Sequence, residues 1–329
     1  MFKAFVIDQQ GDAVRGAVTE LDDKQLPNEA LTVDVEYSTL NYKDGMVIKG
    51  LGRMVRKYPH VPGVDLAGVV AESSDERFVI GDRVVVTGWR VGESYWGGYS
   101  QKVRVNPDFA IKLPDSLSCF HAMALGTAGL TAMLAIESLE RMGMTTASQR
   151  PILVTGAAGG VGSIAVLALS RLGYSVAAST GRPQESHYLT SLGAASVISR
   201  AEFADPVSRP LESERFAGAI DNVGGNSLAR VLAQLESNAS VASVGLVGGA
   251  VFTANVMPFL LRGVNILGID SVSCPNPRRL RAWQRLGELI PRSILESLTT
   301  THPLEDLPEL AEDILDGKIK GRTVIDLHA

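Results

Sequence analysis

A glycine-rich turn is the feature of this sequence with the clearest chemistry. Residues 152–162 read ILVTGAAGGVG, and an apolar helical segment follows at 163–172. Between a buried strand and a helix, glycines let the backbone approach a pyrophosphate, whose charge is stabilised by free N–H groups at the helix N-terminus. The turn therefore predicts a dinucleotide site, although Ala157 replaces the first glycine of the usual pattern and tight packing alone is the alternative. The predicted contacts are Ala157, Ala158, Gly159, Gly160, Val161 and Gly162.

The end of the next predicted strand, 175–179, indicates which dinucleotide binds. Sites for NAD place an Asp or Glu there to bind the ribose hydroxyls. This chain instead has Ser179, Thr180 and Arg182. Two hydroxyls and a guanidinium suit the 2′-phosphate of NADPH, because they can form charge-assisted hydrogen bonds with it. We therefore expect NADPH as the cofactor, and an arginine in an ordinary surface loop is the alternative.

Two later apolar runs also end in small residues. The segments 220–225 (IDNVGG) and 244–249 (VGLVGG) each follow a predicted strand. Because ligands of open α/β sheets bind at the carboxyl ends of the strands, we expect these loops to line the cofactor. Turn chemistry alone would also place Gly and Asn there. The predicted contacts are Asn222, Val223, Gly245 and Leu246.

The overall composition argues against several classes of protein. The 329 residues carry a formal net charge of -5, which gives no general attraction to nucleic acid or to an anionic membrane. Two isolated cysteines and five scattered histidines argue against a metal site or a disulfide framework. Glycines interrupt the uncharged stretches at 151–170 and 237–261, and the N-terminus lacks an apolar signal region. We therefore expect a soluble, cytoplasmic protein without a membrane span.

The pattern of apolar runs changes twice along the chain. Short β-rich runs fill the segment up to about residue 120, whereas strand-like and helical runs alternate from 123 to 289. That alternation predicts an α/β domain with a parallel sheet and crossover helices. The β-rich pattern resumes near residue 290. We therefore expect a discontinuous first domain, 1–122 and 290–329, with a dinucleotide-binding domain, 123–289, inserted in it.

Several short motifs resemble those of the medium-chain dehydrogenase/reductase superfamily, in its zinc-free quinone-oxidoreductase branch. They are NYKD at 41–44, PGVDLAG at 62–68, GDRV at 81–84, GGY at 97–99, GTAGLTA at 126–132 and the turn at 157–162. The resemblance implies a GroES-like β-rich catalytic domain plus a Rossmann-type, doubly wound parallel sheet, with Thr131 among the cofactor contacts. The segment STGR at 179–182, with 188–194 and 283–286, resembles more closely the group of NADPH-dependent acryloyl-coenzyme A reductases.

Two departures from the superfamily's alcohol dehydrogenases imply that no metal is bound. Asn41 stands where those enzymes carry a zinc-ligand Cys, and Gly63, Val64 and Asp65 stand where they carry Gly-His-Glu. Without a Lewis acid, oxidation of a simple alcohol loses the stabilisation of its alkoxide, whereas hydride addition to an activated C=C bond needs positioning and enolate stabilisation. The expected reaction is reduction of a 2-enoyl thioester, with hydride added at the β-carbon and a proton at the α-carbon.

The resemblance also implies roles for individual side chains. Asn41 is expected to be an amide donor near the nicotinamide or the substrate, and Asp44 to orient the ribose or its neighbours. Capping of the helix that begins near Tyr42 is the alternative for this pair. Tyr42 is the candidate proton donor, with solvent as the alternative. An acyl-CoA substrate also needs cations for its phosphates, and the candidates are Arg53, Arg56, Lys57, Arg322 and the basic run at 278–281.

Two other functions and one assembly are compatible with the same residues. An NADPH quinone or enone reductase would use the same site without a basic path for CoA. A non-catalytic, NADPH-binding redox sensor would keep its cofactor affinity when Asn41 and Asp44 are replaced. The apolar strand expected at 265–269 lies late in the sheet, and we predict that it pairs across a two-fold axis in a homodimer.

Overall fold

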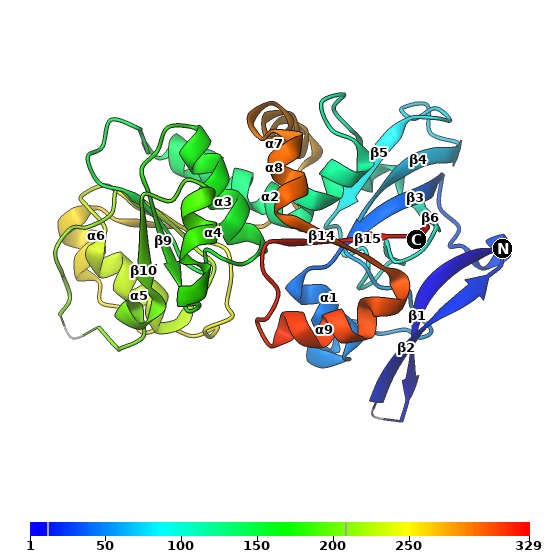
Figure 1. Ribbon diagram of the computed structural model, residues 1–329, viewed down its shortest axis with the longest axis horizontal. Coiled ribbons are helices and arrows are strands. Elements are labelled where there is room, and N and C mark those ends of the chain that lie inside the picture. Colours follow the sequence, from blue (N-terminus) through cyan, green and yellow to red (C-terminus); the bar gives the residue numbers. More distant parts are fainter. Residues whose placement is uncertain (12, 208) are drawn as a thin grey trace. The chain divides into compact units, whose positions relative to one another are not determined.

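The computed structural model describes residues 1–11, 13–207 and 209–329, which form two compact units (Figure 1). The outer unit combines Met1–Thr127 with Val272–Ala329, and the inserted unit is Ala128–Ser271. The chain thus leaves the outer unit once and then returns to it. It returns at residue 272 rather than at the expected 290, because the helix at 276–289 is fastened within the outer unit.

The outer unit is built on a seven-stranded sheet and a separate hairpin. The sheet order is β14-β15-β3-β4-β5-β7, with β6 paired to β3. The last strand pairs antiparallel with β3, where Val324 lies opposite Thr39. Strand bounds are β1 Phe2–Gln10 and β2 Ala13–Leu21 (the hairpin), β3 Leu31–Thr39, β4 Asp65–Ser73, β5 Arg83–Thr87, β6 Lys102–Val105, β7 Ala110–Lys112, β14 Thr299–Pro303 and β15 Arg322–Asp326.

Four helices of the outer unit lie around this sheet: α1 (Tyr42–Ile48), α7 (Asn276–Leu289), α8 (Arg292–Ser297) and α9 (Leu307–Leu315). Although α1 and α9 come from opposite ends of the chain, they pack side by side (Figure 1). A glycine is needed at this contact, because a Cβ on Gly45 would lie 2.7 Å from Ile314 Cγ2. In this unit, short 3-10 helices lie at Asp23–Gln25, Leu51–Arg53, Pro107–Phe109 and Leu304–Asp306. In the inserted unit, they lie at Pro183–Glu185 and Arg200–Phe203.

The inserted unit is built on a six-stranded, all-parallel sheet. Its strand order is β10-β9-β8-β11-β12-β13. The chain therefore adds β9 and β10 on one side of β8 and then crosses over to add β11, β12 and β13 on the other side, which places a topological switch point between β8 and β11. Ligands of such sheets bind outside the carboxyl ends of the strands at this switch point. Strand bounds are β8 Ile152–Val154, β9 Val176–Thr180, β10 Ser196–Ser199, β11 Gly218–Asp221, β12 Ser240–Ser243 and β13 Asn265–Gly268. The helices are α3 Gly160–Arg171, α4 Ser186–Ser191, α5 Gly225–Gln234 and α6 Met257–Arg262.

One helix, α2 (Cys119–Arg141), carries the chain from the outer unit into the inserted one. It is long and apolar enough to cross a membrane, with a mean hydropathy of 1.6 over its most apolar window. However, 89% of that window is buried inside the protein, as in the core helix of a globular domain. The helix is interrupted at Gly126, whose φ of 55° and ψ of -158° are not helical.

Candidate functional site

The glycine-rich turn has the geometry that a bound pyrophosphate requires. It connects β8 to α3, and a Cβ on Gly162 would lie only 2.3 Å from the carbonyl oxygen of Gly156. Helix α3 therefore packs directly on the turn. Its N-cap residue, Gly159, has no side chain that could bond the N–H groups of the first turn. Those N–H groups remain suitable donors to a phosphate, so the turn fits a dinucleotide.

The end of β9 is joined to this turn by hydrogen bonds. The N–H of Ala157 donates to the carbonyl oxygen of Ser179 at 3.0 Å, and Arg182 Nη2 donates to the carbonyl oxygen of Ala158 at 2.9 Å. Ser179 and Thr180 are buried, and Thr180 Oγ1 accepts the N–H of Arg182 at 3.1 Å. Arg182 is half-buried, so its guanidinium is the most accessible of the three predicted groups.

Arg200 is a candidate that reasoning from the sequence missed. It follows β10, the neighbour of β9 in the sheet, and a Cβ on Gly181 would lie 2.6 Å from its Cζ. The guanidinium of Arg200 therefore lies against Gly181, one residue from Arg182. The sequence could have indicated Arg200 only if β10 had been predicted as a strand. The carboxyl ends of neighbouring parallel strands meet at one edge of the sheet, so the residue after β10 then lies close to the residues after β9.

The loop after β11 presents an unsatisfied acceptor at the switch point. Thr155 Oγ1 donates to Asp221 Oδ1 at 2.6 Å, and Asn222 Nδ2 donates to the carbonyl oxygen of Thr155 at 2.7 Å. Burial raises the pKa of Asp221, and hydrogen bonds from Thr155 and Gly224 oppose this shift. The Oδ1 of Asn222 is buried without a hydrogen-bond partner among the described residues. Because its amide is held in place, this oxygen is oriented to accept from a ligand.

The other predicted cofactor residues occupy varied environments. Val223 is buried, whereas Leu246 is 64% exposed. The loops after β11 and β12 touch, since a Cβ on Gly245 would lie 2.3 Å from the carbonyl oxygen of Asn222. Thr131 is buried within α2. Their contact with a cofactor stays a prediction.

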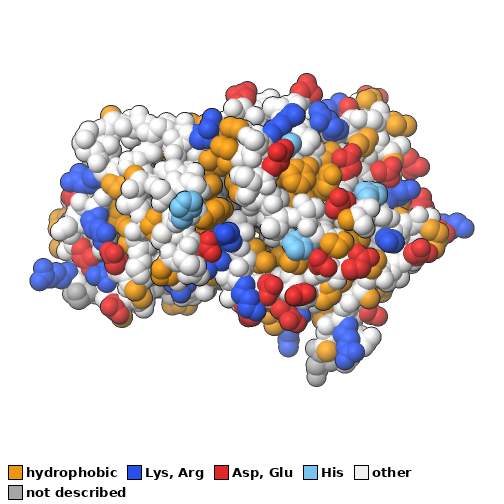
Figure 2. All heavy atoms as spheres, viewed as in Figure 1, with side chains coloured by type: hydrophobic (Ala, Val, Ile, Leu, Met, Phe, Trp, Pro, Cys, Tyr) orange, Lys and Arg blue, Asp and Glu red, His pale blue; other side chains and the backbone are white. Residues whose placement is uncertain are grey.

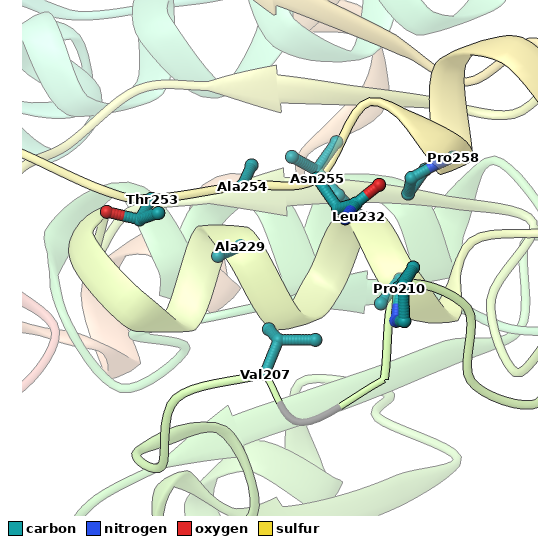
Figure 3. Close-up of a pocket in the computed structure, with 9 residues that line it drawn as sticks. Val207, Pro210, Ala229, Leu232, Thr253, Ala254, Asn255 and Pro258 are labelled. Carbon is teal, nitrogen blue, oxygen red and sulfur yellow. The ribbon is translucent and has the colours of Figure 1, made fainter.

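A cavity of about 240 Å³ lies elsewhere on the inserted unit (Figure 3). The segment at 253–258, helix α5 and the loop before β11 surround it, and none of its lining residues belongs to the predicted cofactor set. It is lined by Val207, Pro210, Ala229, Leu232, Ala233, Thr253, Ala254, Asn255 and Pro258.

In the outer unit, Asn41 and Asp44 form the N-terminal cap of α1. The N–H of Asn41 donates to Asp44 Oδ2 at 2.9 Å, and the N–H of Val64 donates to Asp44 Oδ1 at 2.9 Å. Capping, the alternative reading of this pair, is therefore present. It is accompanied by a buried polar network that a cap does not require.

The amide of Asn41 bridges two buried carboxylates. Its Nδ2 lies 3.2 Å from Asp44 Oδ2 and 2.9 Å from Asp65 Oδ2, while its Oδ1 lies 3.5 Å from Arg322 Nη2. Both N–H groups of the amide thus have acceptors inside the protein. The atom of this amide with remaining capacity is the acceptor Oδ1. The expectation that Asn41 donates to a ligand stays a prediction, and it would require the Nδ2 group to leave one of these carboxylates.

Burial of the two carboxylates alters their acidity. Burial and the neighbouring Asp65 carboxylate raise the pKa of Asp44 to about 7, against hydrogen bonds from Val64 and Asn41. Burial raises the pKa of Asp65 as well, opposed by hydrogen bonds from Thr127 and Asn41 and by the charge of Arg322. Burial and both carboxylates hold the pKa of the Tyr99 phenol well above its usual value. A proton is therefore retained readily at Asp44 near neutral pH.

Comparisons with known proteins agree with this architecture. Residues 27–115 match the alcohol dehydrogenase GroES-like domain, and residues 160–288 match the zinc-binding dehydrogenase family. The chain is 55% identical to the acrylyl-CoA reductase AcuI of Ruegeria pomeroyi, over 100% of both chains. It is 42% identical to the putative quinone oxidoreductase YhfP of Bacillus subtilis, over 99% of each. The crystal structure of the yhdH oxidoreductase from Salmonella enterica in complex with NADP matches with a TM-score of 0.96 and 46% identity, covering 98% of this chain and 99% of that one.

The chain belongs to the medium-chain dehydrogenase/reductase superfamily. Its GroES-like and Rossmann-type parts confirm the fold expected from the sequence. Within residues 1–11, 13–207 and 209–329, no group of three or more His, Cys, Asp or Glu side chains is placed to hold a metal ion. At the position of the superfamily's zinc-ligand Cys, the Asn41 amide is hydrogen-bonded to protein carboxylates.

Two of the arginines expected to bind CoA are buried instead. Arg322 is 3% exposed, and its guanidinium donates to the carbonyl oxygen of Ala124 at 2.9 Å and to Thr39 Oγ1 at 2.8 Å. Arg279, from the basic run, is 1% exposed. Pairing of β15 with β3 takes Arg322 into the unit, so it is not an accessible cation in the structure.

The other cations proposed for CoA lie on the surface. Arg53, Arg56 and Lys57 are all exposed, in the segment that follows α1. Tyr42, at the start of α1, is 42% exposed. On the face of each unit shown in Figure 2, basic side chains are interspersed with acidic ones, rather than gathered in a broad basic surface.

Proposed function

We propose that this protein reduces the C=C bond of a short 2-enoyl-CoA thioester with NADPH, converting acryloyl-CoA to propionyl-CoA. The observation that carries this proposal is 55% identity, over the whole of both chains, to a relative named acrylyl-CoA reductase AcuI. The structure supports the cofactor, because Arg182 Nη2 bonds the glycine-rich turn at 2.9 Å and β9 ends without an acidic residue. An arginine at that position suits a 2′-phosphate.

Three groups in the inserted unit complement NADPH. The turn at 157–162 offers N–H groups to the pyrophosphate, Arg182 a guanidinium to the 2′-phosphate, and Asn222 an acceptor oxygen at the switch point. When bound, NADPH supplies the hydride that is added to the β-carbon of the enoyl thioester.

The side chains of the outer unit orient the substrate and handle its proton. Asn41 Oδ1 is available to accept a hydrogen bond from a ligand, with Asp44 and Asp65 fixing the amide. Negative charge that develops on the thioester oxygen needs N–H or O–H donors, and the proton added at the α-carbon comes from the exposed Tyr42 phenol or from solvent. Arg53, Arg56 and Lys57 supply exposed cations for the phosphates of CoA.

The loss of NADPH absorbance tests this function directly. The values of kcat/KM are compared for acryloyl-CoA, crotonyl-CoA and a benzoquinone, with NADH as the control cofactor. We expect acryloyl-CoA with NADPH to exceed the quinone by about 10²-fold or more. Turnover of the quinone alone would overturn the proposal in favour of a quinone reductase, which the relative named YhfP supports. Tight NADPH binding with no turnover of any acceptor would indicate a redox sensor.

We further propose a cytoplasmic homodimer joined through β13, the last strand of the inserted sheet. Exposed apolar side chains lie at 246–261, the segment that precedes β13 in the chain, and exposed apolar side chains are typical of an interface. They are Leu246 64%, Val247 61%, Val251 85%, Val256 62%, Leu260 74% and Leu261 60% exposed. Light scattering at micromolar concentration should give twice the chain mass, and Leu260→Glu should lower it. A wild-type monomer would exclude the dimer.

A further inference from the structure

The carboxylate of Asp65 joins two segments of the outer unit that are far apart in the sequence. Asp65 is the first residue of β4 and is fully buried. Its Oδ2 accepts the amide of Asn41 at 2.9 Å and the backbone N–H of Thr127 at 2.8 Å, while its Oδ1 accepts the hydroxyl of Thr127. Its own backbone oxygen accepts Ser38 Oγ at 2.7 Å. Three hydrogen bonds therefore hold the carboxylate in place.

The break in α2 at Gly126 makes this arrangement possible. The positive φ of 55° interrupts the helix immediately before Thr127, whose N–H then reaches Asp65 instead of a helical carbonyl oxygen. A Cβ on Gly126 would lie 2.8 Å from Asp65 Oδ2 and 2.9 Å from Arg322 Nη2. Glycine is thus required both by the backbone conformation and by the space that the Asp65 carboxylate and the Arg322 guanidinium occupy.

The same network determines which way the Asn41 amide faces. Its nitrogen is directed to the carboxylates of Asp44 and Asp65, and its oxygen to the guanidinium of Arg322. Rotation of the amide by half a turn would place the oxygen against two carboxylates and the NH₂ group against a cation. That state is disfavoured at every contact, so only the oxygen is left for a ligand.

We propose that Asp65 is a positioning residue of the site. It locks the Asn41 amide in the orientation in which its oxygen acts as a hydrogen-bond acceptor. It also links Asn41 to the backbone at Gly126–Thr127, where the chain leaves the outer unit. The ligand group that Asn41 would meet is then an N–H or O–H donor, of the cofactor or of the acyl-CoA. The locking follows from the outer unit alone, and only the identity of this ligand rests on the proposed function.

Two substitutions at Asp65 separate its geometry from its charge. In Asp65→Asn, the amide oxygen can remain at Oδ2 and accept from Asn41 and Thr127 N–H, while the new NH₂ group donates to the Thr127 hydroxyl, which can accept. The lock is kept and the charge is lost. In Asp65→Ala, both carboxylate oxygens disappear, so the Asn41 amide loses its shortest contact and keeps only the longer ones to Asp44 and Arg322. Asp65→Asn also serves as the second variant if Asp65→Ala fails to fold.

The lock is tested without any turnover by NMR of the protein labelled with ¹⁵N-asparagine. The side-chain NH₂ signals of Asn41 are assigned by their loss in Asn41→Asp. We expect them to exchange slowly with solvent in the wild type and in Asp65→Asn, and at least about tenfold faster in Asp65→Ala. Unchanged exchange in a folded Asp65→Ala, or fast exchange in the wild type, would overturn the proposal.

Kinetics then test whether Asp65 acts through Asn41. We expect Asp65→Ala and Asn41→Ala each to lower kcat/KM by about 10²-fold, and the double variant to lose no more than either alone. Multiplied losses would mean that Asp65 does not act through Asn41. A higher NADPH Kd in Asn41→Ala would identify the cofactor as the donor, and a higher KM for acryloyl-CoA alone would identify the substrate. If the wild type turns over no enoyl-CoA, the proposed function fails while the exchange result still decides the lock.

Discussion

At the scale of single residues, Asn41 has two structural roles at once. Its backbone N–H donates to the Asp44 carboxylate, as in many helix N-termini, and its side chain contacts two carboxylates and a guanidinium. The pair at 41 and 44 therefore satisfies the capping interpretation without excluding a place in the site. The local sequence pointed to Asn41 and Asp44, whereas the contribution of Asp65 depends on the start of β4 meeting the N-terminus of α1.

The acidity of Asp44 predicts a pH-dependent stability of the outer unit. The pKa of Asp44 is about 7 in the folded protein, above its value of about 4 in an unfolded chain. The folded state thus holds more protons between these values, so this contribution to stability is complete below about pH 4 and is lost as the pH rises through about 7. We expect the urea midpoint of the wild type to fall between about pH 5.5 and pH 8.

The control for this prediction is Asp44→Asn. The variant is less stable at both pH values, because both oxygens of Asp44 accept backbone N–H groups and an amide NH₂ cannot. Its midpoint should change less with pH, so that the gap to the wild type narrows at high pH. All three tryptophans, Trp89, Trp96 and Trp283, belong to the outer unit, so their fluorescence follows its unfolding. A gap that widens at high pH would contradict the assignment.

The guanidinium beside the glycine-rich turn should set the preference for NADPH. We expect Arg182→Ala to raise the Kd for NADPH by about tenfold or more, because a charge-assisted hydrogen bond to the 2′-phosphate is lost. Binding of NADH should change by less than about twofold. Arg200→Ala should cause a smaller loss in the same direction, and Arg171→Ala, at the far end of α3, none. Equal losses for NADPH and NADH, measured by calorimetry, would argue against this role.

At the scale of elements, the contact between α3 and its turn depends on one glycine. In Gly162→Ala the new Cβ would lie 2.3 Å from Gly156 O and 2.6 Å from Ala157 Cα, so the helix must move away. We expect overpacking of about 1–3 kcal/mol, a Tm lower by about 5 °C and weaker NADPH binding. Gly159→Ala is the matched control, since its Cβ would be 3.3 Å from Gly156 O. Equal Tm values for the two variants would refute the packing argument.

At the scale of the whole molecule, Arg279 fastens the returning chain to the outer unit. Its guanidinium donates to the carbonyl oxygens of Thr87 at 2.7 Å and Val272 at 2.8 Å, and its Cζ lies 4.9 Å from the Trp89 ring centroid. Nε also donates to the carbonyl oxygen of Cys274 at 2.8 Å. These bonds explain why α7, expected in the dinucleotide-binding domain, belongs to the outer unit.

Removal of this guanidinium should therefore loosen the outer unit. We expect Arg279→Ala to lower the free energy of unfolding by about 3 kcal/mol or more, because buried carbonyl oxygens lose their donors and a cavity opens beside Trp89. Urea unfolding followed by tryptophan fluorescence measures this loss. The control is Arg281→Ala, on the exposed face of α7, which should change stability by less than about 0.5 kcal/mol. Similar effects of the two variants would show that the buried contacts contribute little.

Features that depend on neighbours in the chain were determined by the sequence itself. Local residue types predict the glycine-rich turn, the lack of an acidic residue after β9 and the strand expected at 265–269, because a tight turn or a buried strand selects those types directly. The motifs at 41–44 and 62–68 likewise identified the superfamily. The strands β10 and β14 were missed, since both are short and partly exposed and are defined by pairing with β9 and β15.

Only the tertiary structure decided which charged groups are buried and which groups meet. Arg322 looks like a surface cation in the sequence, but pairing of β15 with β3 places it beside Asn41, which lies 281 positions earlier in the chain. Asp65 acquires its role because β4 and the break at Gly126 converge on the same amide. A sequence pattern predicts local structure, because local structure depends on residues that are adjacent in the chain. Burial and long-range hydrogen bonds arise only when distant segments pack together.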